Sequence, residues 1–215
     1  MLFALFGCGG FGREVMPMVS EYFSFQGNSV EIVFAESVLT DGRWVEGIQV
    51  LTEEEFLRDE RTEKRFNIAI ANSQIRKAMS DRLMESGASP YSIYGRHSIV
   101  SSACQLGDGA IICQGTIITS NAVIGKYFHC NIQSYIAHDC VIGDYVTFAP
   151  RVACNGNVII EDHAYVGTGA IIREGSKDNP TRIGCGAVVG MGAVVTKDIP
   201  AGEIWVGNPA RPLVR

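Results

Sequence analysis

The sequence predicts an α/β unit over residues 1–95, followed by a parallel β-helix over residues 96–215. Three observations predict this fold class. The first 95 residues carry 14 acidic and 9 basic residues, whereas the remaining residues carry 9 of each. An apolar run, a glycine-rich turn and a helical pattern follow one another at the amino terminus. In the second part, apolar residues recur at every sixth position, which indicates stacked coils.

The first part predicts alternating strands and helices. Apolar, strand-forming runs alternate with helical patterns, at residues 2–6, 12–23, 30–34, 66–71 and 73–86. In the last of these segments Ile75, Met79 and Leu83 recur at helical spacing, and Gly87 marks its end. This succession is typical of a small parallel sheet covered by helices.

The second part contains a six-residue repeat. Thirteen successive repeats place an apolar residue at the same position: Val100, Leu106, Ile112, Ile118, Ile124, Cys130, Ile136, Ile142, Phe148, Cys154, Ile160, Val166 and Ile172. The repeat resumes at Ile183 after a polar interruption, residues 174–182, which must loop out of the stack. Three six-residue sides make a coil of about 18 residues that buries its apolar face only against its neighbours.

Composition indicates a globular protein, since 47% of the residues are hydrophobic and 19% are charged. The net charge is -5, and no run of five like charges occurs, which disfavours a nucleic-acid or membrane-surface role. No apolar stretch approaches the roughly 20 residues of a membrane span, and no secretory signal is visible. The seven scattered cysteines are expected to be free thiols. We therefore expect a cytoplasmic protein.

The repeat resembles that of the left-handed β-helix, or hexapeptide-repeat, transferases. An aliphatic residue is often followed by glycine, as at Leu106-Gly107, Ile124-Gly125 and Ile142-Gly143, and a small or β-branched residue follows the aliphatic one four positions later. The resemblance covers residues 98–206 and implies a left-handed coil. It also implies a homotrimer, with active sites in the clefts between neighbouring β-helices.

A glycine-rich turn, G-C-G-G-F-G at residues 7–12, lies between the first predicted strand and the first helix. Glycines there let the backbone approach a pyrophosphate, whose charge is favoured at a helix N-terminus. Glu36 follows the second strand and is suited to accept ribose hydroxyls, which fits NAD as well as a nucleotide-sugar. A turn needed only for strand–helix packing is the alternative. About 95 residues are too few for a full dinucleotide fold, so half of one is predicted.

Over nearly its whole length the chain resembles the PglD/NeuD-like sugar acyltransferases, which join a short Rossmann-like nucleotide-sugar domain to a β-helix. The resemblance includes the segment I-A-I-A-N-S-Q-I-R at residues 68–76. It implies that the protein binds a UDP-sugar. Gly9, Gly10 and Phe11 would bind the diphosphate, Glu36 and Ser37 would bind uracil and ribose, and Ala71 would lie next to the bound UDP-sugar. Ser37 and Ala71 depart from the family pattern, which has a second acid and a glycine there.

His138 occupies the third, outward-facing position of its hexapeptide, and Asp139 follows it. A neutral imidazole can take a proton from an attacking amine, and an adjacent carboxylate can orient the ring and raise its basicity. The other histidines, His97, His129 and His163, are expected at the surface. The spacing of the histidines, with 9 residues from His129 to His138 and 25 from His138 to His163, lacks the H-x-x-x-x-H pair of the trimeric zinc enzymes with hexapeptide repeats, so no metal is expected.

The resemblance assigns roles to further residues. His138 would be the general base and Asp139 its partner, while Asn131, Thr147 and Gly156 would lie near the acetyl group. Backbone at Thr168 and Met191 would line the coenzyme A groove. The closing segment, residues 206–211, is similar to a tail that flanks coenzyme A and would place Pro209 there.

The sequence thus predicts an acetyl-coenzyme A-dependent N-acetyltransferase. The expected acceptor is UDP-4-amino-4,6-dideoxy-N-acetylglucosamine, and the expected product is UDP-N,N'-diacetylbacillosamine. Transfer would be direct, because Cys140, the thiol next to Asp139, has an inward-facing repeat position. Sialic acid O-acetylation, non-catalytic nucleotide-sugar binding and NAD-linked redox chemistry are the alternatives.

Overall fold

The computed structural model describes residues 1–26, 30–39, 42–61 and 63–213. The chain divides into two compact units, Met1–Ile93 and Tyr94–Arg215. The sequence places the boundary two residues later, after residue 95.

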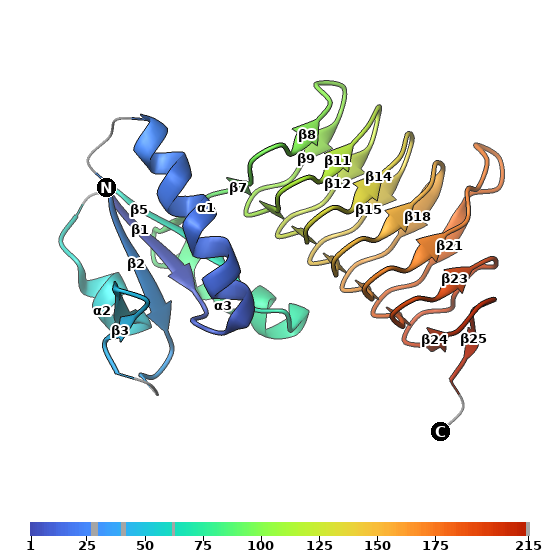
Figure 1. The fold of residues 1–215 in the computed structure, drawn as a ribbon. Coiled ribbons are helices and arrows are strands. Elements are labelled where there is room, and N and C mark those ends of the chain that lie inside the picture. The colour runs from blue at the N-terminus through green and yellow to red at the C-terminus, as the bar shows by residue number, and fades with distance from the viewer. Residues whose placement is uncertain (27–29, 40–41, 62, 214–215) are drawn as a thin grey trace. The chain divides into compact units, whose positions relative to one another are not determined.

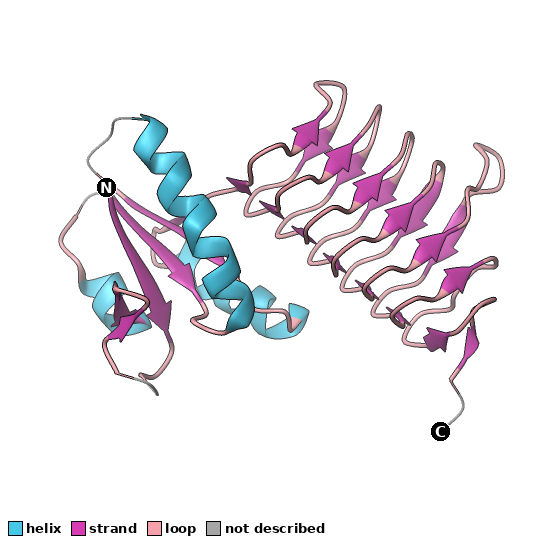
Figure 2. Cartoon of the chain, viewed as in Figure 1, coloured by secondary structure: helices cyan, strands magenta, loops and turns pink. Residues whose placement is uncertain are grey.

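The first unit contains a six-stranded sheet in the order β3-β4-β2-β1-β5-β6. All neighbouring strands pair in parallel except β3 and β4, which form an antiparallel pair. The strands are β1 (Leu2–Phe6), β2 (Glu31–Glu36), β3 (Trp44–Val45), β4 (Ile48–Thr52), β5 (Lys64–Ile68) and β6 (Ser89–Pro90). The helices, cyan in Figure 2, are α1 (Gly10–Gln26), α2 (Glu53–Arg58) and α3 (Ser73–Glu85).

The central position of β1 follows from its sequence. All five residues are apolar and fully buried, as expected for a parallel strand covered on both faces. The turn after β5 is tied down by Arg76, whose buried guanidinium donates to the carbonyl oxygens of Ile70 and Ala71 at 2.7 and 3.3 Å. Asn72 caps α3 by accepting from the backbone of Gln74.

The second unit is a parallel β-helix whose short strands form three faces (Figure 1). Face I comprises β7 (Ile93–Tyr94), β10 (Ile111–Ile112), β13 (His129–Cys130), β16 (Thr147–Phe148), β19 (Tyr165–Val166), β22 (Val188–Val189), β24 (Ile204–Val206) and the antiparallel β25 (Arg211–Pro212). Face II comprises β8 (Ile99–Val100), β11 (Ile117–Ile118), β14 (Tyr135–Ile136), β17 (Ala153–Cys154), β20 (Ile171–Ile172) and β23 (Val194–Val195). Face III comprises β9 (Gln105–Leu106), β12 (Val123–Ile124), β15 (Val141–Ile142), β18 (Val158–Ile160) and β21 (Thr181–Ile183).

The six-residue repeat correctly predicts the core of this unit. Its apolar positions are buried from Ile112 to Ile172, and the resumed repeat is buried again at Ile183. Only Val100 and Leu106, on the first coil, are partly buried. The glycine that often follows the apolar residue allows close stacking. A Cβ on Gly125 would lie 2.6 Å from the carbonyl carbon of Gly143 on the next coil.

The predicted interruption forms the loop between β20 and β21, and the strand resumes at Thr181. All seven cysteines lie in the described part of the chain and are free, and Cys140 is fully buried as its repeat position predicts. The described segments include no helix long and apolar enough to cross a membrane.

The expected surface position of His129 is wrong, because this residue of β13 is only 1% exposed. Its neighbours on face I, Ile111 and Thr147, are buried as well. The period of six identifies the residues that point into a coil. It carries no information on whether the outer surface of that coil is covered.

Candidate active site

Two edges of the β-helix carry the side chains that the sequence singles out. Edge II/III, where the chain passes from face II to face III, carries His138 after β14, Gly156 after β17 and Glu174 after β20. Edge I/II, where the chain passes from face I to face II, carries another set of residues: Asn131, Thr168, Met191 and Pro209. The predicted site residues therefore lie in two groups within one chain.

The imidazole of His138 is held by its neighbour. Its Nδ1 lies 2.8 Å from Oδ2 of Asp139, and both side chains are 49% exposed. Asp139 has a left-handed backbone conformation, with φ of 58° and its N–H donating to the carbonyl oxygen of Ser120. Asn121 donates to the other carboxylate oxygen at 3.2 Å. Asp139 is thus fixed on three sides and can orient the ring.

This pairing sets the charge and the tautomer of the ring. The hydrogen bond to Asp139 raises the pKa of His138, desolvation opposes this, and the charges of Asp139 and Glu174 add to the rise. The same hydrogen bond, with that of Asn121, lowers the pKa of Asp139. Because an ionised carboxylate only accepts hydrogen bonds, Nδ1 of the neutral ring carries the proton. Nε2 is then the nitrogen that can accept a proton.

Gly156 packs against the His138 ring near Cε1 and Nε2. A Cβ at this position would be 2.5 Å from Cε1 and 2.6 Å from Nε2 of His138, so only glycine leaves room for the imidazole. Gly156 is buried, and within the described residues its N–H donates to no hydrogen-bond acceptor. A free N–H on a residue that packs against a proton-accepting ring is suited to bind the carbonyl oxygen of a thioester.

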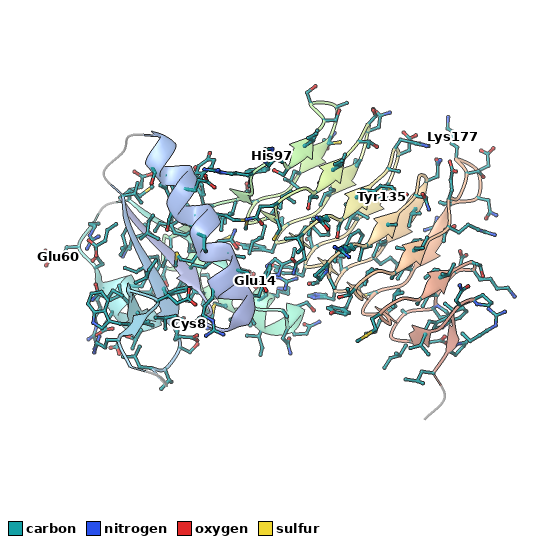
Figure 3. The ribbon with its side chains drawn as sticks, viewed as in Figure 1. Cys8, Glu14, Glu60, His97, Tyr135 and Lys177 are labelled. Carbon is teal, nitrogen blue, oxygen red and sulfur yellow. The ribbon has the colours of Figure 1, made fainter. Side chains whose placement is uncertain are left out.

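Glu174 is a residue of this edge whose role the sequence left open. Its Oε1 lies 3.6 Å from Nε2 of His138. The only signal in the sequence was its place as the first residue of the interruption. Tyr135, labelled in Figure 3 on the outer surface of the coils, donates a hydrogen bond from its hydroxyl to Asn155 at the same edge. Lys177, also labelled there, lies on the loop that Glu174 begins.

Of the residues that the resemblance assigns to acetyl-coenzyme A, four lie along edge I/II: Asn131, Thr168, Met191 and Pro209. Thr168 and Met191 occupy corresponding turns of successive coils, joined by a hydrogen bond from the Gly192 N–H to the Thr168 carbonyl oxygen. The Met191 side chain is 81% exposed and is available to an apolar group of a ligand. Thr147 belongs to β16 and is 8% exposed.

The first unit has its own pocket at the carboxyl ends of β1 and β2. It has a volume of about 540 Å³, and its lining includes Gly9, Arg13, Glu36 and Trp44. Oε1 of Glu36 accepts a hydrogen bond from the Cys8 N–H at 2.7 Å, which ties the end of β2 to the glycine turn. Figure 3 labels Cys8 where β1 leads into α1. Sequence reasoning missed Arg13 and Trp44, for which no motif provided a signal.

The other predicted nucleotide-binding residues lie around this turn. Gly10 and Phe11 are in the first turn of α1, and Ala71 follows β5 at the same edge of the sheet. Ser37 lines a separate hollow next to α2. The third glycine of the motif, Gly12, has a packing role, since a Cβ there would lie 1.8 Å from the carbonyl oxygen of Gly7.

Among the described residues, no three histidine, cysteine, aspartate or glutamate side chains gather closely enough to hold a metal ion.

Comparison with known proteins identifies the family. No family model matches the chain. GDP-perosamine N-acetyltransferase of Escherichia coli O157:H7 is 46% identical over 215 residues, which is all of this chain and 97% of the relative. WeeI of Acinetobacter baumannii AYE is 46% identical, with a TM-score of 0.94, over 99% of this chain and 100% of that structure.

The acetyltransferase domain of PglB from Neisseria gonorrhoeae FA1090, in complex with acetyl coenzyme A, is 26% identical. Its TM-score is 0.85 over 99% of this chain and 98% of that structure. These structures are left-handed β-helix acetyltransferases, so the fold predicted for the second unit is confirmed. The chain therefore belongs to the sugar N-acetyltransferase family that includes GDP-perosamine N-acetyltransferase, and it is an enzyme that uses acetyl-coenzyme A.

Proposed function

We propose that this enzyme acetylates the 4-amino group of a nucleotide-linked 4-amino-4,6-dideoxy sugar. The sequence resemblance gives UDP-4-amino-4,6-dideoxy-N-acetylglucosamine as acceptor and UDP-N,N'-diacetylbacillosamine as product. The relative from E. coli, which matches over the full length, favours GDP-perosamine as a second candidate. Perosamine is itself a 4-amino-4,6-dideoxyhexose. The two candidates share the reacting amine and differ in the nucleotide and in the rest of the sugar.

The observation that carries this proposal is the environment of His138. One ring nitrogen is bound by Asp139 at 2.8 Å, and the other lies on a half-exposed side chain against Gly156, whose N–H donates to no acceptor among the described residues. A base and an oxyanion donor next to each other are what acyl transfer to an amine requires.

His138 acts as the general base. Acetyl-coenzyme A supplies an activated acetyl group as a thioester. As the sugar amine attacks the carbonyl carbon, a C–N bond forms and the C–S bond breaks. Nε2 of His138 takes the proton that the nitrogen loses and passes it to the departing thiolate. Asp139 keeps Nδ1 protonated and stabilises the imidazolium that forms. No covalent acyl-enzyme is needed, which agrees with the burial of Cys140.

The N–H of Gly156 donates to the thioester carbonyl oxygen as negative charge develops on it. One such donor typically contributes about 10²- to 10³-fold to the rate of acyl transfer. Asn131 and Thr147 complete the surroundings of the acetyl group, and Thr168, Met191 and Pro209 line the groove for the rest of coenzyme A.

A homotrimer would bring these groups together. Asn131, Thr168 and Met191 lie on edge I/II, whereas His138 and Gly156 lie on edge II/III of the same chain. A cleft formed by edge II/III of one copy and edge I/II of the next would contain both sets.

The outer surface of face II, which lies between the two edges, is suited to pack against another copy. Its outward side chains include Ile99, Ile117 and Ile171, which are 59%, 42% and 44% exposed. Several exposed isoleucines on one face of the coils are typical of a covered interface. Light scattering coupled to size exclusion should give three times the chain mass of 23.3 kDa, and a monomer at working concentration would contradict the trimer.

The first unit is proposed as a Rossmann-like nucleotide-sugar domain. Its parallel strands, in the order β4-β2-β1-β5-β6, follow the 3-2-1-4-5 order of doubly wound sheets. The diphosphate would lie at Gly9 and Gly10, where the N-terminus of α1 favours its charge. Glu36 would accept ribose hydroxyls through Oε2. Trp44, whose residue is 65% exposed in the same pocket, offers a face on which the base can stack.

The test is release of free thiol from acetyl-coenzyme A by wild type and by His138→Ala. The acceptors are the UDP-amino sugar, GDP-perosamine and free sialic acid. Turnover with one nucleotide-amino sugar, reduced about 10²- to 10⁴-fold in His138→Ala, supports the proposal. Turnover with sialic acid alone would assign O-acetylation. Binding of a nucleotide sugar without turnover would contradict catalysis at this site.

A further inference from the structure

Glu174 is fixed in place by its two neighbours along the chain. The N–H of Arg173 donates to the carbonyl oxygen of Val195, and the N–H of Gly175 donates to that of Gly156, both at 3.0 Å. A Cβ on Gly175 would lie 2.4 Å from the backbone nitrogen of Thr181, so the two ends of the loop are tightly packed. The backbone that carries Glu174 is therefore anchored to the coil that carries Gly156.

The carboxylate of Glu174 lies beside the reactive nitrogen without occupying it. The separation of 3.6 Å between Oε1 and Nε2 of His138 exceeds a hydrogen bond. The side chain is 60% exposed and can adjust to a ligand. The imidazole thus lies between two carboxylates. Asp139 is hydrogen-bonded to Nδ1, and Glu174 lies near Nε2 beyond hydrogen-bond distance. A group that hydrogen-bonds to Nε2 is also within reach of Glu174.

This arrangement distinguishes an amine from a hydroxyl. A sugar amine is partly protonated near neutral pH, and a carboxylate forms a charge-assisted hydrogen bond with an ammonium group that is about twice as strong as a neutral one. A hydroxyl at the same carbon is uncharged and gains only the weaker bond. His138 itself is insufficient for this choice, because a neutral imidazole accepts equally from N–H and O–H donors.

We propose that Glu174 binds the ammonium form of the acceptor and thereby selects amino sugars over the corresponding hydroxyl sugars. The inference rests on the proposed function, since it concerns the same acceptor. Before attack the ammonium group releases one proton to solvent. The second proton leaves the nitrogen as the C–N bond forms, and it passes through Nε2 of His138 to the thiolate. Glu174 is not consumed and changes no bond.

The experiment measures binding in the absence of acetyl-coenzyme A, so that no turnover occurs. Isothermal titration compares the nucleotide-amino sugar that the enzyme accepts with the same nucleotide sugar carrying a hydroxyl at C4. The proteins are wild type, Glu174→Gln and Asp178→Asn. Asp178 is an exposed carboxylate of the same loop, so its variant makes the same charge change away from the ring.

We expect wild type to prefer the amine about tenfold or more, and Glu174→Gln to lose most of that preference while binding the hydroxyl analogue as before. Asp178→Asn should keep the preference. An unchanged preference in Glu174→Gln would overturn the inference, as would equal loss of both ligands, which indicates a structural role. If wild type neither binds nor acetylates either nucleotide-amino sugar, the proposed function fails first, and the inference fails with it.

A kinetic measurement separates this role from a second one, in which Glu174 only raises the basicity of His138. If Glu174 binds the ammonium group, Glu174→Gln should have a higher KM for the amino sugar than wild type. Its KM for acetyl-coenzyme A should be unchanged. An altered pH dependence of kcat with an unchanged KM for the amino sugar would overturn the inference. The other ionisable groups near His138 and Glu174, which are the same in all three proteins, are Asp139, Cys140, Tyr135 and Lys177.

Discussion

Gly156→Ala tests whether His138 works from the position in which the structure holds it. The added Cβ would lie 2.5 Å from Cε1 and 2.6 Å from Nε2 of the ring. Carbon atoms in ordinary contact are about 3.5 to 4.0 Å apart, so the ring must retreat by about 1 Å. Asp139 holds Nδ1 at 2.8 Å, so a ring that retreats from Gly156 strains this hydrogen bond and moves Nε2 away from the reacting amine.

The expected result is a large loss of rate without loss of stability. A misplacement of 1 Å costs about 100-fold in rate, which corresponds to about 2.7 kcal/mol in activation free energy. Gly156 does not have a left-handed φ, so alanine adds no backbone strain there. Thermal unfolding should therefore occur within a few degrees of wild type, while kcat for thiol release falls about 100-fold.

Gly186→Ala is the matched control, in which we expect lower stability and an unchanged reaction rate. Gly186 lies in the turn between β21 and β22, where φ is +65° and nothing lies within 4 Å of the added Cβ. Left-handed strain costs about 1–2 kcal/mol, which lowers the melting temperature by a few degrees and leaves kcat unchanged. Wild-type kcat in Gly156→Ala would refute the idea that the ring is held against Gly156 during catalysis.

Three further substitutions test the remaining parts of the site. Asp139→Asn replaces the carboxylate whose hydrogen bond, and then whose charge, raises the pKa of His138, so this pKa falls. Because the neutral ring acts as the base in the proposed reaction, the acid limb of kcat/KM should move to lower pH, and a limb that stays in place would contradict the pairing. Cys140→Ala should keep wild-type kcat and lose about 1 kcal/mol of stability in a denaturant titration, whereas inactivity in a folded variant would indicate a covalent intermediate. Trp44→Ala should raise the Kd of the nucleotide sugar about tenfold without changing kcat at saturation, and unchanged affinity in a titration would exclude stacking on Trp44.

Much of the β-helix could be predicted from the sequence because its rule is local. Each coil contacts only its neighbours, so the residue that points inward is set by position within six residues. The same rule placed Cys140 inside and His138 outside, and both expectations are confirmed. The alternation of strands and helices in the first unit follows in the same way from short apolar runs and the glycine turn.

Other features could not be predicted, because they depend on contacts between distant segments. Glu174 belongs to a loop outside the repeat, and its approach to His138 is fixed by the hydrogen bond between Gly175 and Gly156. Trp44 is brought to the glycine turn by the pairing of β3 with β4 and of β4 with β2, which no local pattern encodes.

The sequence by itself determined the coil, the inward residues and the adjacency of His138 and Asp139, because these follow from a short period and from neighbouring positions in the chain. Only the tertiary structure decided what faces the ring. It set Gly156 against the imidazole, held Glu174 3.6 Å from Nε2, and separated edge II/III from edge I/II. The physical reason is that coil stacking brings together residues 18 or more positions apart, and the sequence of a single repeat does not specify the distances between side chains on different coils.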